Sequence, residues 1–204
     1  SSEEIASLAG AGAVNLQGSV LSLSGGVDTS FSGVMSGAGS LVKTGTAVFT
    51  MTGVNTFSGG VDLSAGAIQV GNDAALGTGT VTFSGGRISS DSATARVLAN
   101  AFVMSGALGV GEATHNGTLS LSGNVSLTAD TTLTVASAAV ISGVVSGAYS
   151  LTKAGSAELT LSGANTFSGP TNVDAGVLTL SGGSALINSM AVTVGAGGTL
   201  KLAS

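Results

Sequence analysis

The sequence lacks most of the residues that hold small proteins together or give them chemistry. Among its 204 residues there is no cysteine, one proline and one histidine, His115. The absence of cysteine excludes disulfide bonds and thiolate metal sites. A Ser-His-Asp triad or a histidine-based zinc site would have to be built around His115 alone. Stability must therefore come from packing and from hydrogen bonds.

Charged residues are also scarce. They make up 7% of the chain, against about a quarter in ordinary globular domains. The net charge is −5 and only five residues are cationic, so no basic patch can neutralise phosphates and we expect no nucleic-acid partner. No run of 18 apolar residues occurs, and residues 1–10 lack the basic start and apolar middle of a signal peptide. The chain is therefore either cytosolic or a mature fragment.

Glycine and aliphatic residues, by contrast, are abundant and follow a long repeat. The chain contains 34 glycines, and 43% of its residues are hydrophobic. Residues 32–80 and 142–190 match at 22 of 49 positions without a gap, at a constant offset of 110. A fixed period indicates stacked units that bury their apolar faces only against their neighbours. The recurring positions are turn glycines, a lysine (Lys43 and Lys153) and the phrase Asn-Thr-Phe-Ser.

Short segments between the glycines alternate apolar and polar residues, which is typical of half-buried β-strands. The phrase Leu-Ser-Leu-Ser-Gly begins at Leu21 and Leu119, and the similar Leu-Thr-Leu-Ser-Gly begins at Leu159 and Leu178. The last two phrases start 19 residues apart, which is the size of one rung of a parallel β-solenoid. We therefore predict an all-β fold, a parallel β-helix of roughly ten rungs.

The same alternation assigns the faces of each strand. Serine and threonine are expected to point outward, and Lys43 and Lys153 are interpreted as outward residues that block lateral pairing or satisfy a corner carbonyl. Gly53 and Gly163 are expected at corners that need positive φ. The inward side chains are expected to be Leu41, Phe49, Met51, Leu63, Ile68 and Val70 in the first copy, and Leu159, Leu161, Val173, Leu178 and Leu180 in the second.

The region between the two copies is less regular. Residues 92–104 are alanine-rich, but their valines and flanking serines favour strand over a helical turn. Asn116-Gly117 predicts a turn because both residues tolerate positive φ. We expect a single β-helix segment over 1–204, with repeat copies at 32–87 and 142–199 and less regular repeats at 1–31 and 88–141.

The second copy carries a recognisable phrase. Leu151 to Leu180 reads LxKxGxxxxTLSGxNTFSGxTxVxAGxLxL, which resembles the passenger-associated repeat of bacterial autotransporters, also called the autotransporter-associated β-strand repeat. The first copy, Leu41 to Val70, is followed at 76–81 by the family's LGxGxV phrase, whereas residues 186–190 of the second copy depart from it.

The resemblance implies a right-handed parallel β-helix that belongs to a longer passenger. Such a passenger crosses the outer membrane through a β-barrel of the full-length protein and is displayed at the bacterial cell surface or released outside the cell. Partners implied at that location are host cells, glycans or further copies of the chain, through end-to-end or lateral self-assembly. The repeat carries no known catalytic residue to transfer.

The sequence offers no strong candidate for a catalytic site or a metal site. Glu112 could orient His115, but no motif places a nucleophile beside them. The ten acidic residues are scattered, so the carboxylate pair of a polysaccharide-cleaving enzyme is not evident. Gly25-Gly26-Val27-Asp28 and the matching residues 59–62 lack the third glycine of a calcium repeat. We expect no catalytic residue, no cofactor and no metal.

The sequence therefore predicts a structural spacer of a secreted or surface-displayed, adhesin-like autotransporter and not an enzyme. Two alternatives stay open. One is a carbohydrate-acting β-helix enzyme. The other is an ice-binding or surface-binding face made of Thr-x-Thr pairs, at residues 44–46, 78–82 and 132–134, whose spacing does not follow the rungs.

Overall fold

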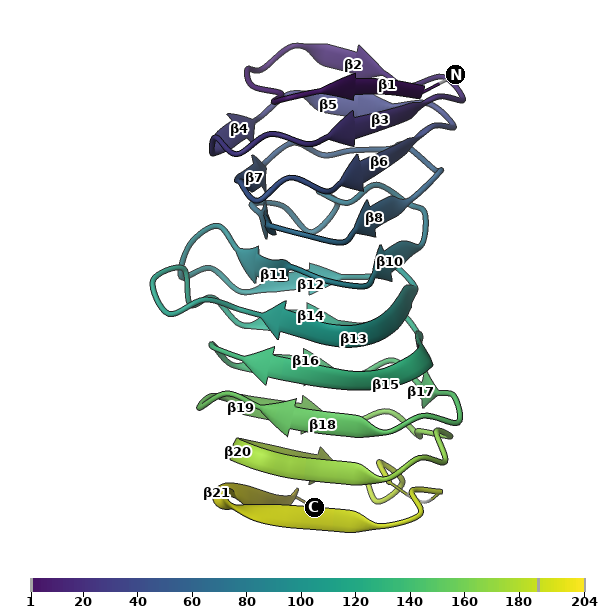
Figure 1. Ribbon diagram of the computed structural model, residues 1–204, viewed down its shortest axis with the longest axis vertical. Helices are drawn as coiled ribbons and strands as arrows, with labels where there is room; N and C mark the ends of the chain where they lie inside the picture. Colours follow the sequence, from purple (N-terminus) through teal and green to yellow (C-terminus); the bar gives the residue numbers. More distant parts are fainter. Residues whose placement is uncertain (1, 187, 204) are drawn as a thin grey trace.

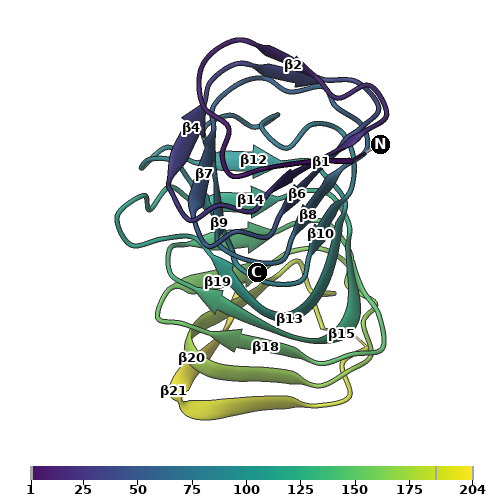
Figure 2. The ribbon, with the colours of Figure 1, turned by 45° about the horizontal axis from the view of Figure 1, so that its top comes forward.

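The computed structural model describes residues 2–186 and 188–203, which form a parallel β-solenoid of about ten turns (Figure 1). The N-terminal turns lie at one end of the rod and the C-terminal turns at the other (Figure 1 and Figure 2). Strands of successive turns pair in parallel, and the described residues contain no helix, so the predicted all-β solenoid is confirmed. The strands are β1 (Ser2–Ile5), β2 (Ala13–Asn15), β3 (Val20–Leu23), β4 (Thr29–Phe31), β5 (Val34–Ser36), β6 (Ser40–Lys43), β7 (Val48–Met51), β8 (Val61–Leu63), β9 (Ala67–Val70), β10 (Val81–Phe83), β11 (Arg87–Ser90), β12 (Arg96–Leu98), β13 (Phe102–Val110), β14 (Leu119–Leu121), β15 (Val125–Val135), β16 (Ala139–Ile141), β17 (Val145–Ser146), β18 (Leu151–Ala154), β19 (Glu158–Leu161), β20 (Thr171–Ser181) and β21 (Val192–Ala203).

The pairing register gives the length of each turn. Leu41 lies opposite Val61, and Val61 lies opposite Val81, so each of these turns adds 20 residues, close to the predicted 19. The longest step is in the middle, where Gly106 lies opposite Thr131 after an irregularity in the ladder. The extra residues of that turn lie between β13 and β14.

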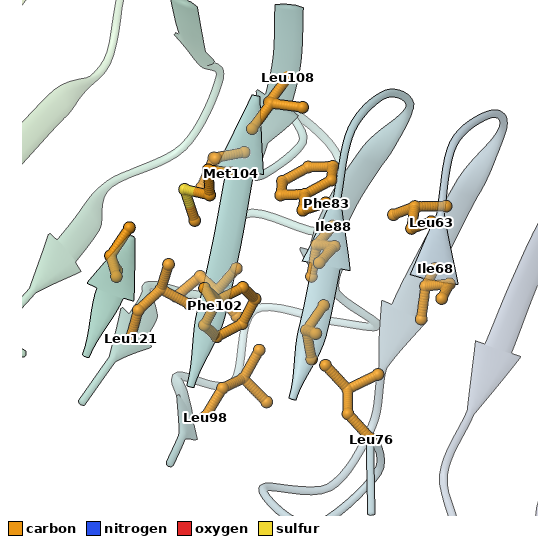
Figure 3. Packing of buried hydrophobic residues seen from close by; sticks show 14 of the residues in the cluster. Leu63, Ile68, Leu76, Phe83, Ile88, Leu98, Phe102, Met104, Leu108 and Leu121 are labelled. Carbon is orange, nitrogen blue, oxygen red and sulfur yellow. The ribbon is translucent and has the colours of Figure 1, made fainter. Parts of the chain in front are cut away.

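The core runs along the axis of the rod. The inward side chains predicted from the alternation are buried, except that Leu180 is only partly buried and packs against the core. Figure 3 shows the central part, where Phe83, Phe102 and Met104 point into the interior from neighbouring rungs. Stacked apolar side chains of this kind supply the main stabilisation, at about 25 cal/mol per Å² of apolar surface removed from water.

The outward rows are mixed. Serine and threonine occupy many of these positions, but Val34, Val54 and Val97 are outward as well and about half exposed. Residues 92–104 contain β12 and the start of β13, which confirms the strand interpretation of this region. Asn116 and Gly117 lie between β13 and β14, but neither has positive φ, so the reason given for a turn there is wrong.

The two repeat copies do not lie directly above one another on the same side of the rod. The strand column that starts at Leu41 continues through Val61, Val81, Phe102 and Val125 and ends at Val145. Val145 is the sequence counterpart of residue 35 in β5, whereas the counterpart of Leu41 is residue 151. Equivalent strands of the second copy are therefore displaced by one side of the coil. The longer middle turns produce this displacement.

Gly53 and Gly163 are required for a reason other than the predicted one. Neither has positive φ. A Cβ atom at Gly53 would overlap the carbonyl oxygen of Gly33, and a Cβ atom at Gly163 would overlap that of Gly143. Successive rungs thus approach so closely at this corner that only glycine fits.

Candidate functional site

A buried asparagine in each copy ties three rungs together. The Asn165 side chain accepts a hydrogen bond from the Val145 backbone nitrogen at 2.8 Å and donates one to the Ala185 carbonyl oxygen at 2.8 Å. Asn55 does the same with Met35, at 2.7 Å, and with the Ala75 carbonyl oxygen, at 2.6 Å. Both asparagines are almost fully buried. Since a buried amide left unpaired is costly, these bonds fix the spacing of the corner.

The recurring lysines also point into the core, which corrects the predicted outward orientation. Lys43 is 2% exposed and Lys153 is 0% exposed. The Lys153 ammonium donates to the carbonyl oxygens of Ala154 at 3.0 Å, Gly155 at 2.8 Å and Ala175 at 2.9 Å. Lys43 donates to the Gly45 carbonyl oxygen. The alternative interpretation, that these lysines satisfy corner carbonyls, is therefore confirmed.

Burial changes the acid–base behaviour of both lysines. Removal from water disfavours the charged form, which lowers the pKa of Lys153 to about 8. The pKa of Lys43 is also lowered by burial, and the negative charge of Asp28 partly opposes that shift. The hydrogen-bond acceptors identified for both ammonium groups are backbone carbonyl oxygens.

The middle of the rod carries a polar cluster on its outer surface. Glu112 contacts the Arg87 guanidinium at 3.2 Å and the His115 Nδ1 atom at 3.3 Å. The amide nitrogen of Gln69 donates to Glu112 at 2.9 Å and lies 3.2 Å from His115 Nδ1. A further ion pair joins Arg96 and Asp91 at 3.0 Å nearby in the sequence. All three ion pairs identified within the described residues therefore involve residues 87–115.

Two segments of the chain match the family model of the passenger-associated-transport-repeat, at residues 41–70 and 151–185. Each of these segments is similar to that repeat. The two matches and the parallel β-solenoid fit a structural domain like those of autotransporter passengers. Comparison with curated proteins and with solved structures gives no significant match. No helix among the described residues is long and apolar enough to span a membrane.

The residues that recur in both copies make their contacts at the corners of the coil. Within each repeat the lysine, the asparagine and the close-packed glycine are all engaged in contacts inside the rod. The phenylalanine that follows two residues after the asparagine, Phe57 or Phe167, is fully buried. The recurring residues with the strongest chemical character therefore serve the stacking of rungs.

The structure places the predicted His115 and Glu112 pair together but gives it no evident nucleophile. Ser89 lies opposite Gln69, which belongs to this cluster, but Ser89 is 0% exposed. Within residues 2–186 and 188–203, no three histidine or acidic side chains lie close enough to hold a metal ion. The half calcium motifs at 25–28 and 59–62 therefore do not form part of such a group.

A mostly apolar groove of about 390 Å³ lies on the outer surface beside Val97 and Asn100. Its one acidic residue, Asp73, already accepts a hydrogen bond from the Val97 backbone nitrogen at 3.0 Å. An acid and base pair for glycoside cleavage needs two carboxyl groups across the bond. This groove offers a single carboxylate, and it is engaged by the backbone.

Sequence reasoning missed the inward lysines and the contacts of Gln69 and Arg87. The lysine pattern did contain a signal, since both lysines occupy the same alternating positions as inward leucines: Lys43 lies opposite Leu63 and Lys153 opposite Val173. No sequence signal could link Gln69 to Glu112, because 43 residues separate them and the turn length decides their contact.

Proposed function

We propose that the chain is a β-helical spacer and surface-display segment of a secreted or outer-membrane-displayed autotransporter, with an adhesin-like role and no catalysis of its own. In this role the rod holds other parts of the full-length protein at a distance from the cell. The partner in this arrangement lies in the outer membrane. Stacked rungs suit this task because each rung is supported mainly by its neighbours.

The observation that carries the proposal is the Asn165 bridge, which links three successive rungs through buried hydrogen bonds. Its counterpart at Asn55 has the same geometry. A sequence feature that recurs because it holds rungs together supports a mechanical role. A binding or catalytic role would instead favour recurring polar residues that are free to meet a ligand.

The proposal is tested by scoring surface display and host-cell adhesion of the full-length protein side by side. The His115→Ala variant should leave both unchanged, because the side chain is 43% exposed and its identified hydrogen-bonding partners are polar groups of the same cluster. The Gly163→Val variant should lower both, because its side chain would collide with the adjacent rung. Loss of a function in the His115 variant with normal display would contradict the spacer role.

A carbohydrate-acting enzyme is the first alternative, favoured only by the Glu112 and His115 contact. Turnover of acidic polysaccharides by the purified chain, abolished in Glu112→Gln, would establish it. The ice-binding or surface-binding alternative needs a flat array of threonine pairs. Thr132 lies opposite Thr152, but Thr134 lies opposite Ala154, so the pair does not repeat on the next rung.

A further inference from the structure

We propose that residues 111–118 form a strap that is held on the rod by charged and polar side chains, and that opens at high ionic strength while the rod stays folded. The strap connects β13 to β14 and contains the extra residues of the longest turn. Because it lies outside every strand, it can leave the surface without breaking a ladder of β-pairing.

The strap lies beside an outward row of side chains that runs over three rungs, and Gln69 and Ser89 are the buried part of that row. Thr50 lies opposite Gln69, and Gln69 lies opposite Ser89. Outward side chains of a solenoid are ordinarily accessible to water, and Thr50 is partly exposed. Gln69 is only 8% exposed and Ser89 is 0% exposed. Glu112 and His115 of the strap contact the Gln69 side chain directly. Ser89 lies opposite Gln69 and next to Ile88, whose carbonyl oxygen accepts a hydrogen bond from Gly111. We attribute the burial of both polar residues to the strap.

The ends of the strap are fixed by the backbone. The Gly111 nitrogen donates to the Ile88 carbonyl oxygen at 2.8 Å, and the Gly117 nitrogen donates to the Ser92 carbonyl oxygen at 2.9 Å. A Cβ atom at Gly117 would overlap the carbonyl oxygen of Thr94, so this end lies tightly against the rod. These two points serve as hinges for the residues between them.

Between the hinges, the contacts identified for the strap are made by side chains. Glu112 reaches Arg87 in β11 and Gln69 in β9, at 3.2 and 2.9 Å, so that it spans three rungs. The strap adds no apolar anchor, since Ala113 is exposed. These ion pairs are only partly buried, with side-chain exposures of 37% for Arg87, 43% for His115 and 22% for Glu112, so water and salt still reach and screen them. Attachment by such contacts is therefore weak and sensitive to ionic strength.

The polar groups beneath the strap are incompletely paired. The Ser89 hydroxyl and the Arg87 Nε atom are buried and have no hydrogen-bond partner within the protein. A buried polar group without a partner favours any state in which water reaches it. Opening of the strap would hydrate both groups, which lowers the cost of separating Glu112 from the rod.

The absence of native cysteine makes a direct test possible. A single Ser89→Cys substitution places the only thiol of the protein under the strap, and its rate of labelling by a thiol reagent reports opening. We expect labelling to increase severalfold between low salt and about 1 M salt, where charges more than about 3 Å apart are screened. Adding Glu112→Gln should raise the rate at low salt and remove most of its salt dependence.

Three controls complete the experiment. Thr50→Cys lies in the same row outside the strap, so it should label rapidly at both salt concentrations. Leu161→Cys in the core should stay unlabelled at both, which shows that the rod remains folded. Asp62→Asn, an exposed acid on β8, should not alter labelling of Ser89→Cys. Equal Ser89→Cys rates at both concentrations, or a parallel increase at Leu161→Cys, would overturn the proposal.

Discussion

The Lys153 ammonium lies 2.9 Å from the carbonyl oxygen of Ala175, which belongs to the next rung of the solenoid. The same group donates to two carbonyl oxygens at its own corner. A positive charge at 0% exposure therefore closes one turn and joins it to the following one. This arrangement makes the stability of the rod depend on pH above neutrality.

Lys153→Met should remove an alkaline increase in stability. The folded pKa of Lys153 is about 8, against an ordinary 10.5, so the unfolded chain binds more protons between these values and stability rises with pH across that window. Below pH 8 the lysine is protonated in both states and contributes no slope. Chemical denaturation from pH 7 to 11 measures the effect. A wild-type slope between pH 8 and 10.5 identical to that of Lys153→Met would contradict it.

Asn165→Ala should destabilise the chain by about 2–3 kcal/mol, because it leaves the Val145 nitrogen and the Ala185 carbonyl oxygen buried without their partner. Asn172→Ala is the matched control. That side chain is only partly buried and makes a single 3.3 Å bond to Thr152, so its loss should cost well under 1 kcal/mol. Equilibrium urea unfolding compares the two, and equal losses would show that the bridge does not contribute.

Leu159→Asp should lower the melting temperature far more than Thr160→Asp. Leu159 is 1% exposed and points into the core, so the aspartate would be a buried carboxylate without a partner. Thr160 lies on the outward row of the same strand. Circular dichroism during heating checks both variants. Since inward and outward positions alternate, a larger loss for Thr160→Asp would mean that the faces are exchanged.

Gly163→Ala should be destabilising although its φ is negative or extended. The added methyl group would overlap the Gly143 carbonyl oxygen, and neither backbone segment can move without disturbing the ladder. We expect a loss of about 1–3 kcal/mol. Gly12→Ala is the control, because a Cβ atom there meets nothing within 4 Å. A neutral effect at both positions, measured by urea unfolding, would refute close approach as the reason for this glycine.

The sequence contained enough to predict the solenoid and its core. Alternation around Leu159 and Leu161 gave the inward face, and the spacing of similar phrases gave the length of the regular turns to within one residue, but not that of the longer middle turns. The lysines were misassigned because hydropathy alone places an ammonium group in water. Both ammonium groups bind carbonyl oxygens at their own corner, and that of Lys153 also binds the Ala175 carbonyl oxygen of the neighbouring rung, so these acceptors exist only once the coil has formed.

The central cluster was predictable only in part. Glu112 and His115 are three residues apart, so their contact could be anticipated. Gln69 and Arg87 contact Glu112 because the turns that carry these residues stack in one particular pairing register. The length of the middle turns determines that register, and no local pattern encodes it.

The displacement of the second copy by one side of the coil also changes the direction in which its outer surface faces. The column that begins at Leu41 ends at Val145, so equivalent surfaces of the two repeat copies face different directions around the long axis. A rigid two-headed receptor approaching from one direction could dock on one copy at a time. An antibody raised against the exposed surface of one copy would therefore meet the equivalent surface of the other copy on a different side of the rod.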